Sequence, residues 1–472
     1  MFLIQIRPEY LRLSLAAGCG LGLSLALLLL PGLNFGLTEG NPTARAANGL
    51  RYVAPTGADG LNPCTNPGQP CATVQHAVDM ANPGDEIRVA AGAYTGISQR
   101  QGITQVVYID KPVSVRGGFS PANWTAADPP ANPTMLDAGG QGRVMVISGT
   151  ITATVEGLQL WGGNLNTGGG PGACGGLCVV GAIVTLDHND IFSNTGSGVF
   201  VVFGQATLTN NSIYSNTGEW GGGVSITSGR ATLSGNIIHQ NQAERSGGGI
   251  AADYASSIQL ENNIISNNTA SETGGGIYVY YQSQATLTNT IIVANRATLA
   301  GSGLYIHDNS TARLLHTTLV RNHGGDGSGV HVTFDSAAAL TNTILVSHTV
   351  GITVASGSTA SLEATLWGSG DWANGSDWGG AGSIAAGTIN IWGDPAFITL
   401  PGGDYRLSPA SAALDQGVNA GVTADIDGEP RPYGAGYDLG ADEGQPSLVI
   451  SKAASTNLAQ PGAPLTYTLQ VT

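Results

Sequence analysis

The sequence predicts an all-β fold, a right-handed parallel β-helix in which short strands wind into a solenoid with three faces. Three observations predict it. Glycine is over-represented, with 71 in 472 residues, and charged residues make up only 10%, a composition suited to short strands joined by tight turns. A repeat of 22 to 27 residues runs from about residue 150 to residue 366. One repeat is too short to bury its own apolar face, so neighbouring repeats must stack.

The chain opens with a predicted export signal over residues 1–46. An apolar run extends from Leu13 to Leu30, and the small residues Ala44 and Ala46 suit cleavage. We therefore expect a secreted, cell-surface-associated protein with no membrane insertion after cleavage. The alternative is an uncleaved anchor, because the apolar run approaches the roughly 18–20 residues that cross a bilayer.

The charge pattern disfavours two classes of partner. The net charge is -15, and lysine occurs only at Lys111 and Lys452. Nucleic acid and anionic membrane surfaces attract clustered basic side chains, so neither is an expected partner.

The cysteines beyond the leader form two local pairs. Cys64 and Cys71 enclose the loop CTNPGQPC, and Cys174 and Cys178 enclose CGGLC. In an oxidising compartment, pairs of this kind predict two disulfides. The alternative is a zinc site with four cysteines, although neither spacing is the usual CxxC. We expect no cofactor, except calcium if the protein is a lyase.

Each repeat contains a glycine-rich corner, a short strand such as GGGIYVY, and a second strand of the type ATLTN. A leucine anchors the second strand, an apolar residue follows five places later, and an asparagine stands eight places after the first six leucines. We interpret the asparagines as turn residues that hydrogen-bond along the solenoid axis. The leucines are Leu186, Leu208, Leu233, Leu260, Leu287, Leu314 and Leu340; the asparagines are Asn194, Asn216, Asn241, Asn268, Asn295 and Asn322, and His348 takes the seventh place.

The stretch from Arg51 to Gly96 resembles the opening coil of many secreted parallel β-helix proteins. This resemblance implies a solenoid over residues 48–400, whose open end is capped by a short helix from Ala72 to Ala81, before a first strand EIRVA. Such a cap covers unpaired strand edges. The GGGI corners with their Ile-x-x-Asn turns also resemble the repeats of polymorphic outer-membrane proteins.

Two further resemblances lie near the end of the chain. Residues 401–446, with the motif DIDGEPRPYGAGYDLGADE, resemble the tail of the choice-of-anchor Q family, whose solenoids are of the pectate-lyase-like kind. Residues 447–472 are similar to the first two strands of the immunoglobulin-like module DUF11. Two strands of a sandwich are not stable alone, which implies the start of a longer or truncated β-sandwich module.

Aromatic residues recur on the strand after the glycine corner. If Ile277 and its equivalents point inward, the alternate residues point outward. Exposed rings in such a row suit stacking against sugar rings or a protein partner, although cross-strand aromatic pairs also stabilise sheets. The candidate ligand-binding residues are Tyr278, Tyr280, Tyr305, His307 and His331, with Asp253 at the edge.

Two functions remain open. The first is a noncatalytic adhesin or envelope scaffold that binds a polysaccharide or a surface protein along this row. The second is a polysaccharide lyase or hydrolase acting on a linear acidic glycan, which needs a pair of carboxylates, or a base beside carboxylate-bound Ca²⁺. A third possibility is that the protein is purely a structural spacer. We predict no catalytic or metal-binding residue. The weaker catalytic candidates are the acidic residues before the glycine corners, Glu219, Glu244, Glu272 and Asp326; the group Asp187, His188 and Asp190; and the turn Asp425, Asp427 and Glu429.

Overall fold

The computed structural model describes residues 49–167, 169, 172–399 and 404–444, together with the backbone of two strands, Ile450–Ala454 and Tyr467–Val471. The predicted leader, with both possibilities for its fate, lies outside the described residues. Among the described residues, no helix is both long enough and apolar enough to cross a membrane.

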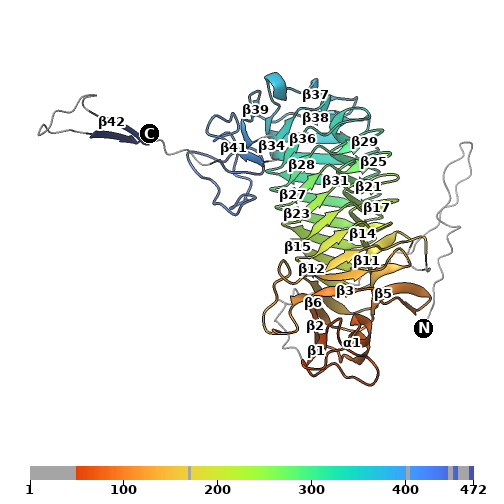
Figure 1. The fold of residues 1–472 in the computed structure, drawn as a ribbon. Coiled ribbons are helices and arrows are strands. Elements are labelled where there is room, and N and C mark those ends of the chain that lie inside the picture. Colours follow the sequence, from red (N-terminus) through yellow and green to blue (C-terminus); the bar gives the residue numbers. More distant parts are fainter. Residues whose placement is uncertain are drawn as a thin grey trace, which may run out of the picture. The chain divides into compact units, whose positions relative to one another are not determined.

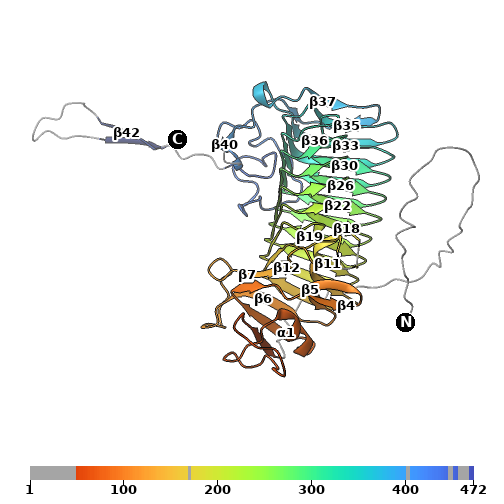
Figure 2. The same cartoon turned by 45° about the vertical axis from the view of Figure 1, so that its right-hand side comes forward.

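The chain winds into successive coils whose strands stack in register, as a right-handed parallel β-helix does (Figure 1). One face is a twelve-stranded sheet, seen as a column of neighbouring strands in Figure 2. Its pairings are parallel except for β4 with β5. Its strands are β4 Ser98–Arg100, β5 Ile103–Ile109, β8 Arg143–Ser148, β11 Cys174–Val180, β14 Ser197–Val202, β18 Val224–Thr227, β22 Ile250–Asp253, β26 Ile277–Tyr280, β30 Leu304–His307, β33 Ser328–Val332, β35 Val350–Val354 and β37 Ser376–Gly379.

The other two faces belong to a twenty-three-stranded sheet made of two parallel ladders. The first ladder contains β1 Leu50–Val53, β2 Glu86–Ala90, β6 Ser114–Phe119, β9 Thr152–Glu156, β12 Ile183–Asp187, β15 Gln205–Thr209, β19 Arg230–Ser234, β23 Ser257–Glu261, β27 Gln284–Thr288, β31 Thr311–Leu315 and β38 Ser383–Ala385. The second contains β3 Gly92–Tyr94, β7 Thr134–Asp137, β10 Gln159–Trp161, β13 Asp190–Phe192, β16 Ser212–Tyr214, β20 Ile237–His239, β24 Ile264–Ser266, β28 Ile291–Val293, β32 Thr318–Val320 and β39 Asn390–Ile391. The long strands β34 Ala337–Val346 and β36 Thr359–Leu366 take part in both.

Smaller elements complete the fold. A short ladder precedes the glycine corners and consists of β17 Thr217–Gly218, β21 Gln242–Ala243, β25 Thr269–Ala270 and β29 Arg296–Ala297. The 3₁₀ helix η2 covers Gly370–Trp372, and β40 Phe397–Thr399 pairs with β41 Asp404–Leu407. Further along, β42 Ile450–Ala454 and β43 Tyr467–Val471 form an antiparallel pair. The rest of the predicted module at residues 447–472 lies outside the described residues.

The predicted repeat register is confirmed in the core. All seven anchoring leucines, and the apolar residues five places after them, are at most 2% exposed. Equivalent residues pair across coils, as Leu260 does with Leu287. The leucines therefore form one continuous column inside the solenoid.

The predicted asparagine column is also confirmed as a hydrogen-bonded ladder. Each buried amide donates to the next, as Asn241 Nδ2 does to Asn268 Oδ1 at 3.0 Å, and Asn322 Nδ2 lies 3.2 Å from His348 Nε2 at the end of the row. The ladder asparagines themselves do not have the left-handed backbone that asparagine tolerates in turns, because that conformation belongs to the residue before each ladder position, such as Asn267 with φ 55°. A second ladder, which the sequence reading missed, joins Asn189, Asn211, Asn236 and Asn263 in the same way.

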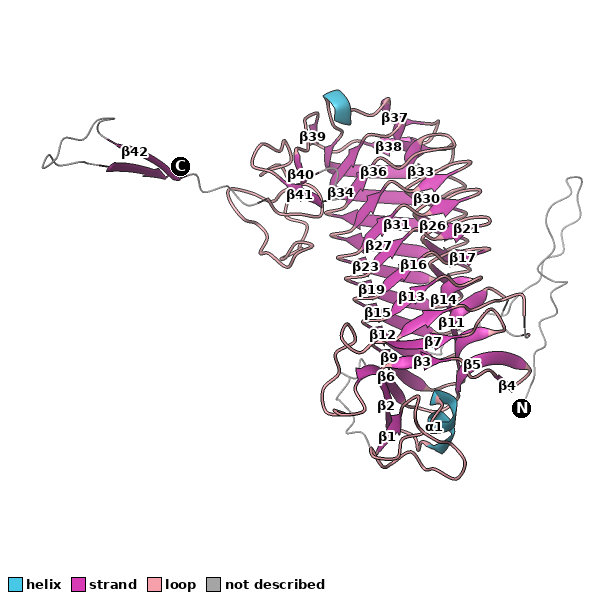
Figure 3. Ribbon diagram, viewed as in Figure 1, coloured by secondary structure: helices cyan, strands magenta, loops and turns pink. Residues whose placement is uncertain are grey.

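A helical cap is present at the N-terminal end (Figure 3). Helix α1 spans Val74–Met80, within the predicted range, and the Thr73 hydroxyl accepts from His76 N at its start. Gln75 accepts from the Tyr108 amide at 2.6 Å, which ties the helix to β5. EIRVA is β2 rather than the first strand, because β1 precedes the helix and pairs with β2 in parallel.

Both predicted disulfides are present, Cys64–Cys71 and Cys174–Cys178. The alternative zinc site is wrong, because all four sulfur atoms are already bonded.

Residues 404–444 pack against the side of the twenty-three-stranded sheet. A second apolar cluster joins Leu407 and Leu439 of this tail to Val320 and Ile344 of the coils. The tail is also hydrogen-bonded to the coils, as where Asn342 Nδ2 donates to the Val418 carbonyl at 2.7 Å.

Candidate ligand-binding face

The rings predicted on the twelve-stranded sheet come together in one contiguous group. Strand alternation places Ile277 and Val279 in the core, both 0% exposed, and turns Tyr278 and Tyr280 outward. Register then aligns Tyr278 with Tyr305. We call the whole group the aromatic face: Trp220, Tyr254, Tyr278, Tyr280, Tyr281, Tyr305, His307, His331 and Phe334.

The centre of the aromatic face is a stacked array. Tyr278 and Tyr305 stack with centroids 5.8 Å apart and planes at 16°, and Tyr305 stacks on His331 at 5.1 Å. Along strand β30, Tyr305 also stacks on His307 at 5.8 Å and 19°. Contacts of this geometry stabilise the rings beyond simple burial.

The expectation that this row is exposed was wrong at its centre. Tyr278 is only 6% exposed, and Asp253 is 8% exposed. The indole of Trp220, from a corner two coils earlier, lies 5.7 Å from the Tyr278 ring. Ala251 stands in register beside Tyr278, and its small side chain leaves room for this indole.

The glycine corners also cover the tyrosines. At Gly274, with φ +64°, an added Cβ would lie 2.9 Å from Tyr278 Cβ, and at Gly301, with φ +60°, it would lie 2.8 Å from Tyr305 Cδ2. These glycines therefore serve the backbone turn, as predicted, and in addition let the corner pack against the rings.

The accessible part of the aromatic face lies one turn beyond the predicted residues. Tyr254 and Tyr281 are 44% and 41% exposed, and Phe334 is 62% exposed. They contact the inner rings, with Tyr254 6.0 Å from Tyr280 and Phe334 4.3 Å from His307. Sequence reasoning missed them because they lie in turns. The signal was present, since each stands four places after the first inward residue of its strand.

Burial tunes the ionisable groups of the aromatic face. It raises the pKa of Asp253 to about 6 and that of Tyr305 to about 12, and it lowers the pKa of His307, because a low-dielectric site disfavours charge. The raised pKa keeps the Tyr305 hydroxyl protonated well above neutral pH. It can both donate and accept hydrogen bonds, as sugar hydroxyls require.

Asp253 and His307 each keep a polar atom without a hydrogen-bond partner. These atoms are Asp253 Oδ1 and His307 Nδ1, and both are buried. Burial is the main cause of the raised pKa values of Tyr278 and Tyr280, and the nearby charge of Asp253 adds to it. Burial with incomplete pairing disfavours the charged form, so Asp253 takes up a proton at a higher pH than an exposed aspartate does.

His331 is held by a carboxylate. Its Nδ1 lies 2.6 Å from Asp326 Oδ2, and the Ser328 hydroxyl donates to Asp326 Oδ1 at 2.6 Å. Burial acts to raise the pKa of Asp326, but the hydrogen bonds from His331 and Ser328 outweigh it, so the net pKa is lowered. Asp326 thus orients His331 within the stack.

The acidic residues before the glycine corners, which sequence position alone would align in one column, do not form one. Arg245 separates Glu219 from Glu272, since its amide donates to the Glu219 carbonyl and its carbonyl accepts from the Glu272 amide. Its guanidinium lies 3.3 Å from the Glu272 carboxylate and 4.5 Å from the Trp220 ring centre. The segment before this corner is shifted by one residue relative to its neighbours, so Arg245, and not Glu244, lies between Glu219 and Glu272.

The two other acidic groups are local. Asp187 lies 2.8 Å from His188 on the surface, while Asp190 accepts instead from Gln159 at 3.4 Å.

Asp425 is fully buried and accepts from the amides of Asp427 and Glu429, as a turn-forming residue does. Among the described residues, one group of metal-ligating side chains is close enough to share an ion, and it consists of Cys64, Cys71 and His76. The two cysteines of this group are joined in a disulfide.

Comparisons with known proteins agree with the fold. The sequence profile described as "Right handed beta helix region" matches residues 175–366. A search of curated proteins gave no match.

Among solved structures, "Crystal structure of pectate lyase Pel9A" is similar with a TM-score of 0.52 and 14% identity, covering 85% of this chain and 97% of that chain. "The complex structure of XylC with xylose" has a TM-score of 0.47 and 9% identity, covering 89% of this chain and 100% of that chain. At such identities the likeness concerns the fold alone. The chain thus contains a right-handed β-helix region, with the overall architecture of a pectate lyase.

Proposed function

We propose that this protein is a noncatalytic β-helix protein, secreted or held at the cell surface, that binds a glycan along the aromatic face. The carrying observation is the contiguous group of rings, whose inner members are fixed by stacking and whose outer members, Tyr254, Tyr281 and Phe334, are exposed. Rigid rings can stack on sugar faces with little loss of side-chain freedom. The rings extend over neighbouring coils, from Tyr254 after β22 to Phe334 after β33, which suits a linear polymer.

The fold itself is compatible with either binding or cleavage, because one fold hosts many functions. The pectate lyase with the same architecture acts on a polysaccharide, which supports a glycan as the ligand class. For cleavage, a glycosidase needs two carboxylates facing one bond. In the described residues, Glu272 is paired with Arg245, and Asp326 is engaged by His331 and Ser328. The carboxylate arrangement therefore favours binding.

The test is a glycan-array measurement on the full chain, with a Tyr254→Ala, Tyr281→Ala double variant. These side chains are exposed, so their loss leaves the core intact, whereas truncating the buried Tyr278 would open a cavity. Tyr433→Ala is the matched control, because Tyr433 is 43% exposed but lies in the tail. We expect the double variant to lose binding and the control to retain it.

Three results would count against the proposal. Equal binding by the double variant and the wild type would remove the aromatic face from recognition. Release of unsaturated or reducing sugar products from a bound glycan would establish catalysis, and the search would then return to the acidic residues. If no glycan binds, and a surface protein binds the wild type but not the double variant, the partner of the aromatic face is a protein.

A further inference from the structure

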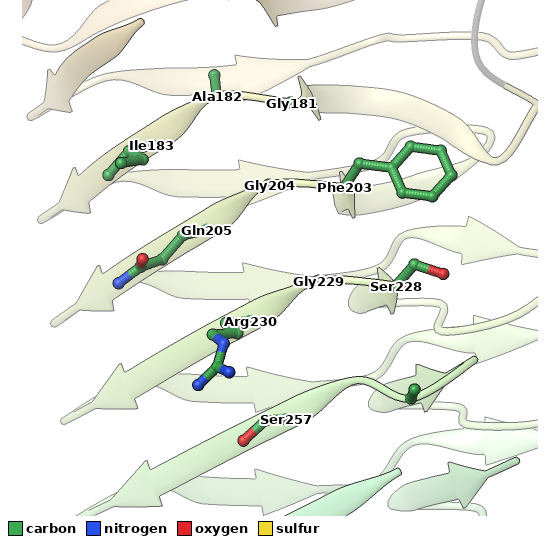
Figure 4. Close-up of a pocket in the computed structure, with 11 residues that line it drawn as sticks. Gly181, Ala182, Ile183, Phe203, Gly204, Gln205, Ser228, Gly229, Arg230 and Ser257 are labelled. Carbon is green, nitrogen blue, oxygen red and sulfur yellow. The ribbon is translucent and has the colours of Figure 1, made fainter. Parts of the chain in front are cut away.

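A shallow groove follows the edge where the twelve-stranded sheet meets the first ladder of the other sheet. Figure 4 shows it crossing the coils that contain β12, β15, β19 and β23, and its volume is about 330 Å³. We call it the corner groove. It is lined by Gly181, Ala182, Ile183, Phe203, Gly204, Gln205, Ser228, Gly229, Arg230, Ala255 and Ser257.

The groove has a backbone floor and two unlike walls. Gly204 and Gly229 lie between the walls in Figure 4, and an added Cβ at Gly204 would lie 2.7 Å from the Ala182 carbonyl oxygen. On one side stands Phe203, and on the other stand Gln205 and Arg230, which are neighbours in register. A Cβ at Gly204 would meet the neighbouring coil, so this glycine lets the coils pack closely, and backbone forms the floor between the aromatic wall and the polar wall.

Phe203 is presented in an unusual way. Its side chain is 62% exposed, and its backbone φ is 53°, a conformation that bulky residues adopt uncommonly. The equivalent turn residue Ser228 also has φ 50°, so the conformation belongs to the turn, and it is the exposure of the Phe203 ring that makes it available to a ligand. The equivalent turn positions two and three coils later are Tyr254 and Tyr281, also at positive φ, so the groove continues the exposed edge of the aromatic face.

The polar wall offers unused hydrogen-bond donors. Within the described residues, the side chains of Gln205, Ser228, Arg230 and Ser257 make no hydrogen bond or ion pair. No residue lining the groove is acidic, in a chain with 32 acidic and 17 basic residues. The lining thus carries one cation, Arg230, and no anion, in a protein whose net charge is -15.

We propose that the corner groove is a second binding site, for a sugar residue that carries an anionic group. The Arg230 guanidinium binds the anionic oxygens through two parallel N–H donors, a geometry that suits a carboxylate or a sulfate ester. Phe203 packs on the sugar ring, and Gln205 with the serines binds its hydroxyls. This inference rests on the proposed function and deepens it, since it names an acidic glycan that lies over both the groove and the aromatic face.

The experiment measures dissociation constants of the full chain by calorimetry for three probes. They are short oligogalacturonates, the same oligosaccharides as neutral methyl esters, and chondroitin sulfate. The variants are Arg230→Gln and Phe203→Ala. Arg296→Gln is the matched control, because Arg296 is also exposed and unpaired among the described residues but lies on β29, away from the groove.

Wild-type protein should bind at least one acidic probe more tightly than the neutral esters, and the preferred probe identifies carboxylate or sulfate as the natural group. Arg230→Gln should weaken that binding at least about tenfold and leave the neutral esters unaffected. Phe203→Ala should weaken acidic and neutral probes alike. Arg296→Gln should change nothing.

Three outcomes overturn the inference: no preference for acidic probes, no effect of Arg230→Gln, or an equal effect of Arg296→Gln, which would indicate nonspecific charge. The Tyr254→Ala, Tyr281→Ala variant separates this result from the proposed function. If it abolishes binding while Arg230→Gln does not, the aromatic face stands and the groove fails. If only Arg230→Gln weakens binding, the groove stands and the aromatic face fails.

Discussion

Replacing one ladder asparagine, Asn268→Ala, should destabilise the middle of the solenoid. The side chain is 0% exposed. Its Nδ2 donates to the Ile238 carbonyl at 2.9 Å and to Asn295 Oδ1 at 3.0 Å, and its Oδ1 accepts from the Asn241 amide at 2.9 Å and from Asn241 Nδ2 at 3.0 Å. Alanine removes all four bonds.

The lost hydrogen bonds affect mainly the coil that precedes Asn268. Asn295 Oδ1 keeps the Asn268 backbone amide, and Asn241 Nδ2 keeps the Ile213 carbonyl. The Asn241 backbone N–H loses its ladder partner while buried. An unsatisfied buried donor costs about 1–3 kcal/mol, and each other bond contributes about 0.5–1.5 kcal/mol. With one unsatisfied donor and three other lost bonds, we therefore expect the free energy of unfolding to fall by about 2.5–7.5 kcal/mol.

The matched control is Asn267→Ala. Asn267 is exposed, has no side-chain hydrogen bond and adopts φ 55°. Alanine already occupies the equivalent position one coil later, at Ala294 with φ 53°, so we expect a cost of only about 1 kcal/mol.

Urea unfolding of the full chain gives the total change, and hydrogen exchange locates it. Because solenoid coils interact mainly with their neighbours, exchange should rise first at the Asn241 amide. If Asn268→Ala costs no more than Asn267→Ala, or if exchange rises uniformly, the ladder does not stabilise the coils as argued.

Three further predictions concern the tail and one loop. Arg431→Met should loosen residues 404–444 by about 3–5 kcal/mol, because it leaves a fully buried carboxylate without its ion-pair partner; limited proteolysis within the tail, with the coils intact, would show it, and uniform resistance would contradict it. Burial raises the pKa of Asp438 and of Asp442 to about 7. Because folding raises these two pKa values, the protonated carboxyls stabilise the tail fully below about pH 4, and this stabilisation is lost as the pH rises through about 7. Hydrogen exchange of the tail amides, corrected for intrinsic rates, should therefore be faster at alkaline than at acidic pH. Equal rates would refute this. Cys174→Ser should lower the free energy of unfolding by up to about 2 kcal/mol, as expected for so short a loop; an unchanged urea midpoint would show that the disulfide is not needed for stability.

The sequence was sufficient for features that repeat in register. Leucine spacing gave the core column, and the asparagine spacing gave one ladder, because stacked coils place equivalent residues on top of one another. It was insufficient where side chains cross coils. The burial of Tyr278 depends on Trp220, a residue two corners away whose position no local pattern reveals.

Irregular corners limited the prediction in another way. The acidic residues seemed to share one column because each precedes a glycine corner. In the structure, the segments before the corners differ by a residue in alignment, and Arg245 takes the intervening place. Counting along the chain fixes strand positions well, but it does not fix side chains in loops of unequal length.

The asparagine ladder also bears on how such a chain can change in length. Each internal asparagine donates to the next coil and accepts from the previous one through the same atoms. A whole coil duplicated or removed within this run would leave every amide with an identical partner. The row of asparagines ends where Asn322 contacts His348. A coil inserted or removed beyond that point would not find identical partners. Gain or loss of internal coils would lengthen or shorten the aromatic face in steps of one coil, about 4.8 Å, and thereby change how much of a linear polymer it can contact.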